Sequence, residues 1–231
     1  MKLQKETSTL QGGHGKWYDD ACGTAFGLEL IGERWALLVV RELMFGPRRF
    51  SDLRASLPGI SAKVLTERLA TLETAGVMAR RRLPSPAPVQ VYELTQWGYR
   101  IEPVIQELGR WAAMSSLHDP TLPLSPVSLM LSLRTMFDPA KARGIEAVVG
   151  FDIAGEQFIA RMKDGSLPIT RGNPNQAEAV FRAPAAPVIA GLLYADVPVA
   201  DLERDAGLTI EGDRELALRF ADIFELPEKL A

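Results

Sequence analysis

The sequence predicts two domains, a mainly helical domain followed by an α+β domain. The 231 residues suffice for two small domains. A proline-rich segment from His118 to Val127 interrupts the chain near its middle, and apolar residues at helical spacing before it give way to alternating apolar residues after it. We expect an N-terminal tail at residues 1–20, domains at 21–117 and 128–231, and a linker at 118–127.

Composition limits the classes of protein to consider. Hydrophobic residues make up 47% and charged residues 24%, which is typical of a globular protein with a full core. Because the chain has no apolar run of about 20 residues and no signal-peptide core, we expect a cytoplasmic protein that is not in a membrane. The single cysteine, Cys22, excludes a disulfide framework, and two histidines cannot complete the usual zinc site. We predict no metal and no cofactor.

Charge is divided unevenly along the chain. Residues 1–118 contain 15 Lys and Arg against 12 Asp and Glu, whereas residues 119–231 contain 11 against 17. The basic excess is densest between Arg41 and Arg82, where nine basic residues accompany four acidic ones. A basic front half and an acidic back half predict different partners for the two domains.

The most informative stretch runs from Ser61 to Gly76. Leu65, Leu69 and Leu72 share one helical face, while Ser61 can cap the helix and Gly76 can end it. Such a helix can lie in the major groove of DNA, although an ordinary surface helix would show the same pattern. Small or hydrogen-bonding side chains dominate its expected outer face: Lys63, Thr66, Glu67, Ala70, Thr71 and Thr74.

The elements around this helix complete a winged helix-turn-helix. A hairpin follows it, and then a helix capped by Thr95, in which Pro103 should cause a bend or a late start. Helix, helix, helix-turn-helix, hairpin and helix is the order of that fold. Three helices are expected before the helix at 61–76: a short buried helix at 22–31, a core helix at 34–45 and a short helix at about 50–56. The two strands of the hairpin are expected at 77–83 and 89–94.

This front half resembles the HxlR-type, MarR-related winged-helix transcription regulators from about Cys22 to Trp111. The resemblance rests on the segments CGTAFGLELIGERW, ELMFGPRRFSDL, PGISAKVLTERLATLETAGVMARR and VYELTQWG. It implies a cytoplasmic homodimer that binds double-stranded operator DNA, with a dimer seam formed by 96–117 and 17–31. The proline-rich wing tip and the long C-terminal half depart from the family pattern.

The expected DNA contacts divide into base contacts and phosphate contacts. Lys63 can donate to guanine, Thr66 can contact a thymine methyl or a polar edge, and Glu67 can accept from cytosine. Phosphate contacts are expected from the helix N-terminus and from four arginines. The residues in this second group are Ser61, Arg48, Arg49, Arg80 and Arg82.

The contacts of Glu67 and of the wing arginines have simpler alternatives. Glu67 can pair with Arg68 or Lys63 on the helix surface. The arginines at 80–82 can form an ordinary solvated strand edge.

Cys22 is a candidate redox sensor, because the resemblance implies that role for an N-terminal cysteine. A thiol near a helix N-terminus should also be acidified. The alternative is a small buried apolar residue.

The back half predicts several meandering strands with helices on one face, an α+β domain. The order of elements and the segment GLTIEGDRELALRF are similar to sterol-carrier (SCP2)-like domains. This resemblance implies a cavity for a small apolar ligand, although the same side chains could be ordinary core. The candidate lining residues are Met130, Leu133, Phe158, Met162, Leu192, Leu193 and Phe224.

The sequence leaves two rival functions. A winged helix could contact protein while the back domain holds lipid. An enzyme in the back domain is disfavoured, because no phosphate loop, HExxH motif or nucleophile with a histidine base is found and no catalytic residue is predicted.

Overall fold

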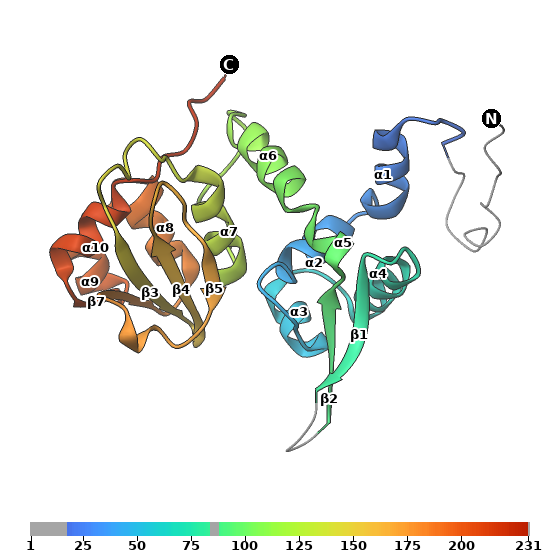
Figure 1. The fold of residues 1–231 in the computed structure, drawn as a ribbon, viewed down its shortest axis with the longest axis horizontal. Helices are drawn as coiled ribbons and strands as arrows, with labels where there is room; N and C mark the ends of the chain where they lie inside the picture. Colours follow the sequence, from blue (N-terminus) through green and yellow to red (C-terminus); the bar gives the residue numbers. More distant parts are fainter. Residues whose placement is uncertain (1–17, 84–87, 231) are drawn as a thin grey trace. The chain divides into compact units, whose positions relative to one another are not determined.

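The computed structural model describes residues 18–83 and 88–230 (Figure 1). The chain divides into two compact units, residues 1–100 and 101–231. In the described parts of the chain, no helix has the length and apolar character needed to cross a bilayer. The predicted domain ranges of 21–117 and 128–231, with a linker between them, stay a prediction. The predicted tail at 1–20 falls largely outside the described residues.

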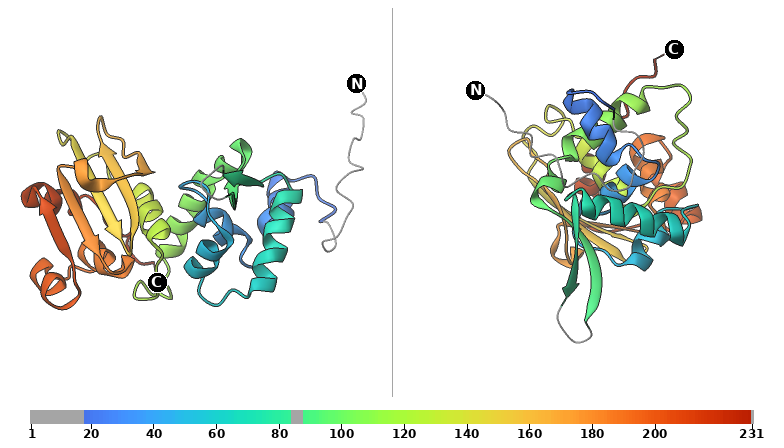
Figure 2. Two further views of the ribbon diagram at one scale, coloured as in Figure 1. Left: turned by 90° about the horizontal axis from the view of Figure 1, so that it is seen from below. Right: turned by 90° about the vertical axis from the view of Figure 1, so that its right-hand side faces the viewer.

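The first unit has the predicted order of elements for a winged helix-turn-helix. Its hairpin projects from the helices of the unit (Figures 1 and 2). Both strands form where the sequence predicts them, with Met78 opposite Leu94 and Leu83 opposite Val89. The elements are α1 (Gly23–Ile31), α2 (Ala36–Glu42), α3 (Phe50–Ser56), α4 (Ala62–Thr74), β1 (Met78–Leu83), β2 (Val89–Leu94) and α5 (Gln96–Tyr99).

Helix α2 is the centre of the first core, as predicted. Val39 and Val40 are fully buried, and α4 packs against α2. The leucine stripe of α4, formed by Leu65, Leu69 and Leu72, is buried as its spacing requires.

Two details of this core correct the sequence predictions. Thr71, predicted on the outer face, lies on the inner side of α4 next to Leu72 and is buried. Its hydroxyl is satisfied there, because it donates to the Glu67 carbonyl within the helix at 2.9 Å. Helix α1, predicted to be buried, contains no buried residue. It packs against α4, and its apolar side chains Phe26 and Leu28 stay 44% and 50% exposed.

The predicted long helix after Thr95 is interrupted. The short helix α5 is followed by α6 (Glu102–Ala113), with Pro103 in the first turn of α6. Proline is tolerated there because a first-turn N–H has no partner within the helix. A late start of the helix at Pro103 is one of the two outcomes that the sequence predicts.

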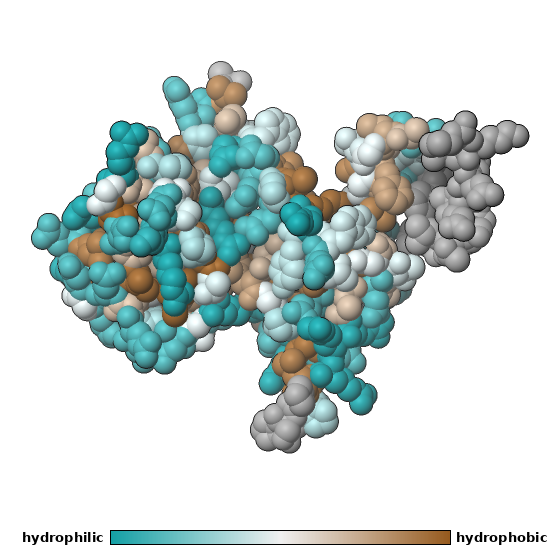
Figure 3. Space-filling model, viewed as in Figure 1, coloured by the Kyte–Doolittle hydropathy of each residue, from teal (hydrophilic) through white to brown (hydrophobic). Residues whose placement is uncertain are grey.

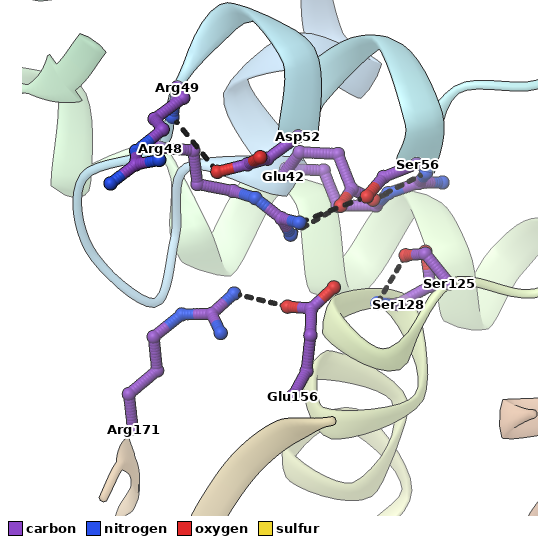
Figure 4. Close-up of polar contacts among 10 residues, drawn as sticks. Glu42, Arg48, Arg49, Asp52, Ser56, Ser125, Ser128, Glu156 and Arg171 are labelled. Carbon is purple, nitrogen blue, oxygen red and sulfur yellow. Dashed lines mark hydrogen bonds and ion pairs between the residues drawn. The ribbon is translucent and has the colours of Figure 1, made fainter. Parts of the chain in front are cut away.

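A buried ion pair joins three elements of the first unit. Glu42 in α2 is fully buried, and Arg48 Nη1 lies 3.2 Å from Glu42 Oε2 while Arg48 Nη2 donates to Ser56 Oγ in α3 (Figure 4). Arg41 also binds Glu42 at 2.9 Å. The Arg48 backbone pairs with Tyr92 of the wing through two hydrogen bonds of 3.0 and 2.8 Å. One arginine therefore connects α2, α3 and β2.

The second unit is an α+β domain, as predicted. Its sheet has the order β5-β4-β3-β6-β7, in which β3 and β6 are parallel and the other pairs are antiparallel. Besides α6, its elements are α7 (Pro126–Met136), β3 (Ala147–Ile153), β4 (Glu156–Met162), β5 (Ile169–Arg171), the 3-10 turn η1 (Pro174–Gln176), β6 (Ala179–Ala183), α8 (Ala186–Tyr194), α9 (Val199–Asp205), β7 (Thr209–Gly212) and α10 (Arg214–Ala221).

The core of this unit lies between one face of the sheet and the helices. Phe151, Phe158 and Phe181 are fully buried on that face, and Phe151 lies 5.5 Å from Phe181 between ring centroids. Helices α8 and α10 pack against β6, and α7 packs against α8 and α6. On the opposite face, η1 lies against Gly150, where a Cβ would be 2.5 Å from a side-chain carbon of Pro174.

We predict that Arg48→Met lowers the free energy of unfolding by about 2–4 kcal/mol, because the Glu42 carboxylate would lose its buried partner and keep Arg41, whose side chain is partly exposed. Urea denaturation measures this change. Arg49→Ala is the matched control, since Arg49 is the exposed neighbour and its loss should change stability by less than about 0.5 kcal/mol. Equal stability of the two variants would contradict a structural role for Arg48.

Candidate nucleic-acid interface

Helix α4 presents a polar face to solvent. Ser61 precedes the helix, and its hydroxyl oxygen accepts a hydrogen bond from the Val64 N–H at 3.2 Å. This cap fixes the first turn, and the buried leucines fix the rotation of the helix. Lys63, Thr66 and Glu67 are therefore exposed on the first two turns, together with Ser61.

The charged pair on this face is weak. Lys63 Nζ lies 3.9 Å from a Glu67 carboxylate oxygen, and the two side chains are 86% and 46% exposed. An exposed pair at this spacing contributes less than about 1 kcal/mol, so both groups can exchange it for another partner. Arg68, the other predicted partner of Glu67, instead pairs with Glu33. Thr66 is exposed, and its hydroxyl donates a hydrogen bond to the Ala62 carbonyl.

Three exposed arginines lie on the elements that precede and follow α4 in the chain. Arg49 precedes α3, Arg82 lies near the end of β1, and Arg54 lies in the last turn of α3. Within the residues that the structure describes, none of the three forms an ion pair. The sequence did not predict Arg54 as a DNA contact. It contributes to the basic excess, but no motif distinguishes it from the other arginines.

Arg80 is exposed, but it already forms an ion pair within the domain. Its guanidinium binds Glu73 of α4, with Nη2 2.6 Å from Oε2, and this carboxylate raises the pKa of Arg80. The pair joins the wing to α4. It also agrees with the alternative of a solvated strand edge for this residue.

The side chain of Arg48 is buried, whereas the predicted phosphate contact requires it at the surface. Its side chain is only 7% exposed and points toward Glu42 and Ser56, whereas the next residue, Arg49, is exposed (Figure 4). A buried guanidinium satisfied by a carboxylate and a hydroxyl cannot reach a phosphate. The expected phosphate contact of Arg48 is therefore corrected to a structural role.

Cys22 is exposed and lies directly before α1. The backbone N–H groups of Thr24 and Ala25, and then the Thr24 hydroxyl, lower the pKa of the Cys22 thiol. The thiolate is the nucleophilic form, so this position favours reaction with electrophiles. The alternative of a buried apolar cysteine does not apply.

The predicted ligand-lining residues lie mainly in the core of the second unit. Six of the seven are buried, and Leu192 is half-buried. The structure brings only Leu192, Leu193 and Phe224 to a hollow of about 310 Å³, which Tyr194 also lines. The other four, which do not line that hollow, are Met130, Leu133, Phe158 and Met162.

The rim of this hollow is charged. Lys141 binds Glu225 at 2.7 Å, and Asp196 and Asp222 lie beside them. Burial raises the pKa of Tyr194 to about 12, and its hydroxyl lies 2.8 Å from the Ser132 hydroxyl. Over the described part of the chain, no group of three or more His, Cys, Asp or Glu side chains is placed to hold a metal ion.

Comparison with known proteins identifies the front half. The model of the HxlR-like helix-turn-helix family matches residues 30–119. The uncharacterised HTH-type transcriptional regulator YvaP of Bacillus subtilis is 40% identical over 86 residues, which are 37% of this chain and 79% of YvaP. The HTH-type transcriptional regulator YodB of Bacillus subtilis is 40% identical over 83 residues, which are 36% of this chain and 74% of YodB.

The solved structure of the reduced form of YodB is 35% identical to this chain. The matched region covers 42% of this chain and 98% of the YodB chain, with a TM-score of 0.39. The curated relatives are transcriptional regulators and not enzymes. With a polar α4 face, a flanking wing and these sequence relatives, the chain belongs to the HxlR-like helix-turn-helix family of DNA-binding transcriptional regulators.

Proposed function

We propose that this regulator binds a specific operator as a homodimer, with α4 in the major groove. The observation that supports this most directly is the exposed row Ser61, Lys63, Thr66 and Glu67 on the first two turns of a capped helix. The N-terminal turns of a recognition helix are the part that contacts base edges. Ser61 and the helix N-terminus favour a phosphate, and Lys63 favours guanine.

The proposed phosphate contacts are Arg49, Arg82 and, after release from Glu73, Arg80. Arg54 joins this group because it is exposed on α3. Phosphate contacts add affinity for any duplex, whereas base contacts distinguish sequences. The two groups should therefore respond differently to substitution.

We also propose a dimer seam formed by α1 and α6. Val104, Leu108 and Trp111 follow one another at helical spacing on α6 and are 56%, 45% and 70% exposed. Figure 3 shows apolar surface over both helices. A second copy covering these side chains would remove them from water. A dimer that reads two half-sites presents its two recognition helices about 34 Å apart, one turn of DNA. A wild-type protein that sediments as a monomer at micromolar concentration would contradict the seam.

Lys63→Ala should lower discrimination between the operator and other DNA by about 1–3 kcal/mol, because it removes a base contact. Arg49→Ala should instead weaken binding to all duplexes alike and reduce the salt dependence by about one unit of slope. Gel-shift titrations of operator and random DNA at several salt concentrations measure both effects. If the two variants behave identically, the proposed division between base and phosphate contacts is wrong.

We propose that Cys22 senses electrophiles through its position between the N-terminal segment and α1. Treatment with a quinone should then lower operator affinity by about tenfold or more. Cys22→Ser is the control, since it removes the only thiol of the chain. Equal quinone sensitivity of wild type and Cys22→Ser, measured by gel shift, would exclude this role.

We propose that the second unit is an SCP2-like domain that binds a small apolar ligand. A sheet with helices on one face supports this, as does the hollow lined by Leu192, Leu193 and Phe224. Ligand binding changes operator affinity only as far as the ligand prefers one conformation.

Native mass spectrometry of protein purified gently from cells should detect a retained apolar molecule. Leu193→Glu should abolish its retention, because it places a carboxylate beside Leu192 and Phe224, the apolar part of the lining. The exposed substitution Lys163→Glu is the control. Ligand-free spectra for the wild type, also after addition of fatty acids and sterols, would refute the proposal.

A further inference from the structure

Helix α6 packs against α7 of the second unit and is bonded to that unit near both of its ends. The compact units divide between Arg100 and Ile101, so α6 groups with the α+β domain although the family match continues to residue 119. Ile105 and Ala113 are buried, and α6 packs against α7. The opposite side bears Val104, Leu108 and Trp111.

Polar contacts hold α6 at three levels. At its N-terminal end, Arg134 of α7 binds Glu102 at 2.6 Å, with both side chains three-quarters or more buried. Near its C-terminal end, Arg110 donates to the Thr135 carbonyl of α7. These contacts add directional bonds to the apolar packing of the two helices.

The third level is the segment 226–230, which follows α10 and reaches the C-terminal end of α6. Lys229 Nζ donates to the carbonyls of Ala113 at 2.9 Å and Ser115 at 3.1 Å. The Leu230 N–H donates to the Met114 carbonyl at 2.7 Å. The last carbonyls of a helix lack partners within the helix and attract a positive charge, so an ammonium group at this place is favourable.

We propose that Arg134 and Lys229 are positioning residues for dimerisation, through which the α+β domain sets the affinity of the α6 seam. This inference rests on the proposed function, because it assumes that Val104, Leu108 and Trp111 meet a second copy. A helix held at both ends loses less conformational freedom when it pairs than a loose one. Any change in the α+β domain that loosens these contacts therefore weakens the dimer and its hold on DNA.

The test compares full-length variants by sedimentation. Lys229→Ala removes the C-terminal contact, and Glu102→Gln removes the charge at the N-terminal contact while keeping its shape. Each should weaken dimerisation by about threefold, and the double variant by about tenfold. Operator affinity should fall at low protein concentration and return to the wild-type value at concentrations well above the dimer dissociation constant.

Three further variants separate positioning from simple loss of stability. Lys229→Arg keeps a cation with several donors and should stay within about twofold of wild type. Lys163→Ala is the matched control, because that lysine is exposed in the same unit and pairs with Glu146 instead. Trp111→Glu places a charge in the seam itself and should abolish the dimer, which confirms that the assay measures this interface.

The outcomes distinguish the two proposals. A wild type that neither dimerises nor binds DNA would overturn the proposed function. A wild type that does both, with the double variant within twofold of its dimer constant, would overturn only the positioning roles. A double variant whose thermal unfolding midpoint falls while its dimer constant is unchanged would assign the contacts to stability alone, and would also overturn the inference.

Discussion

Burial of the leucine stripe on α4 is the constraint on which the DNA-binding half depends. Leu65 and Leu72 are fully buried and Leu69 nearly so, and they allow the helix only one rotation about its axis. That rotation places Ser61, Lys63 and Glu67 in solvent. Turning the helix would expose three leucines, at a cost of about 1.5–3 kcal/mol each. Packing inside the domain thus selects the side chains that are available outside it.

The two adjacent arginines before α3 have different environments, one buried and one exposed. Arg48 satisfies the buried carboxylate of Glu42, and its backbone pairs with Tyr92, so α2, α3 and the wing are joined at one place. Arg49 is the exposed neighbour. One residue of this basic segment therefore serves the internal architecture, and the other stays exposed for the proposed contact with DNA. A charge count alone overstates the number of cations that face the duplex.

The front half was largely predictable from local signals. The leucine spacing, the Ser61 cap, and the positions of the strands depend on residues close in sequence, and the structure confirms them. The inward direction of Arg48 and the exposure of α1 were not predictable, because they depend on contacts with Glu42 and on how little of α1 the unit covers. The Lys229 contact joins residues 116 positions apart and has no sequence signal. In the back half, the α+β class followed from alternation, whereas only three of the candidate lining residues meet at one hollow.

The most direct test of the account is selection of binding sites from a pool of random duplex DNA by the full-length protein. Two recognition helices one turn of DNA apart predict an enriched palindrome, with half-sites separated by about 10 base pairs from centre to centre. Enrichment of no sequence at low ionic strength would contradict DNA reading by α4. Enrichment of a single unrepeated half-site would contradict the dimer that places two copies of α4 on one face of the duplex.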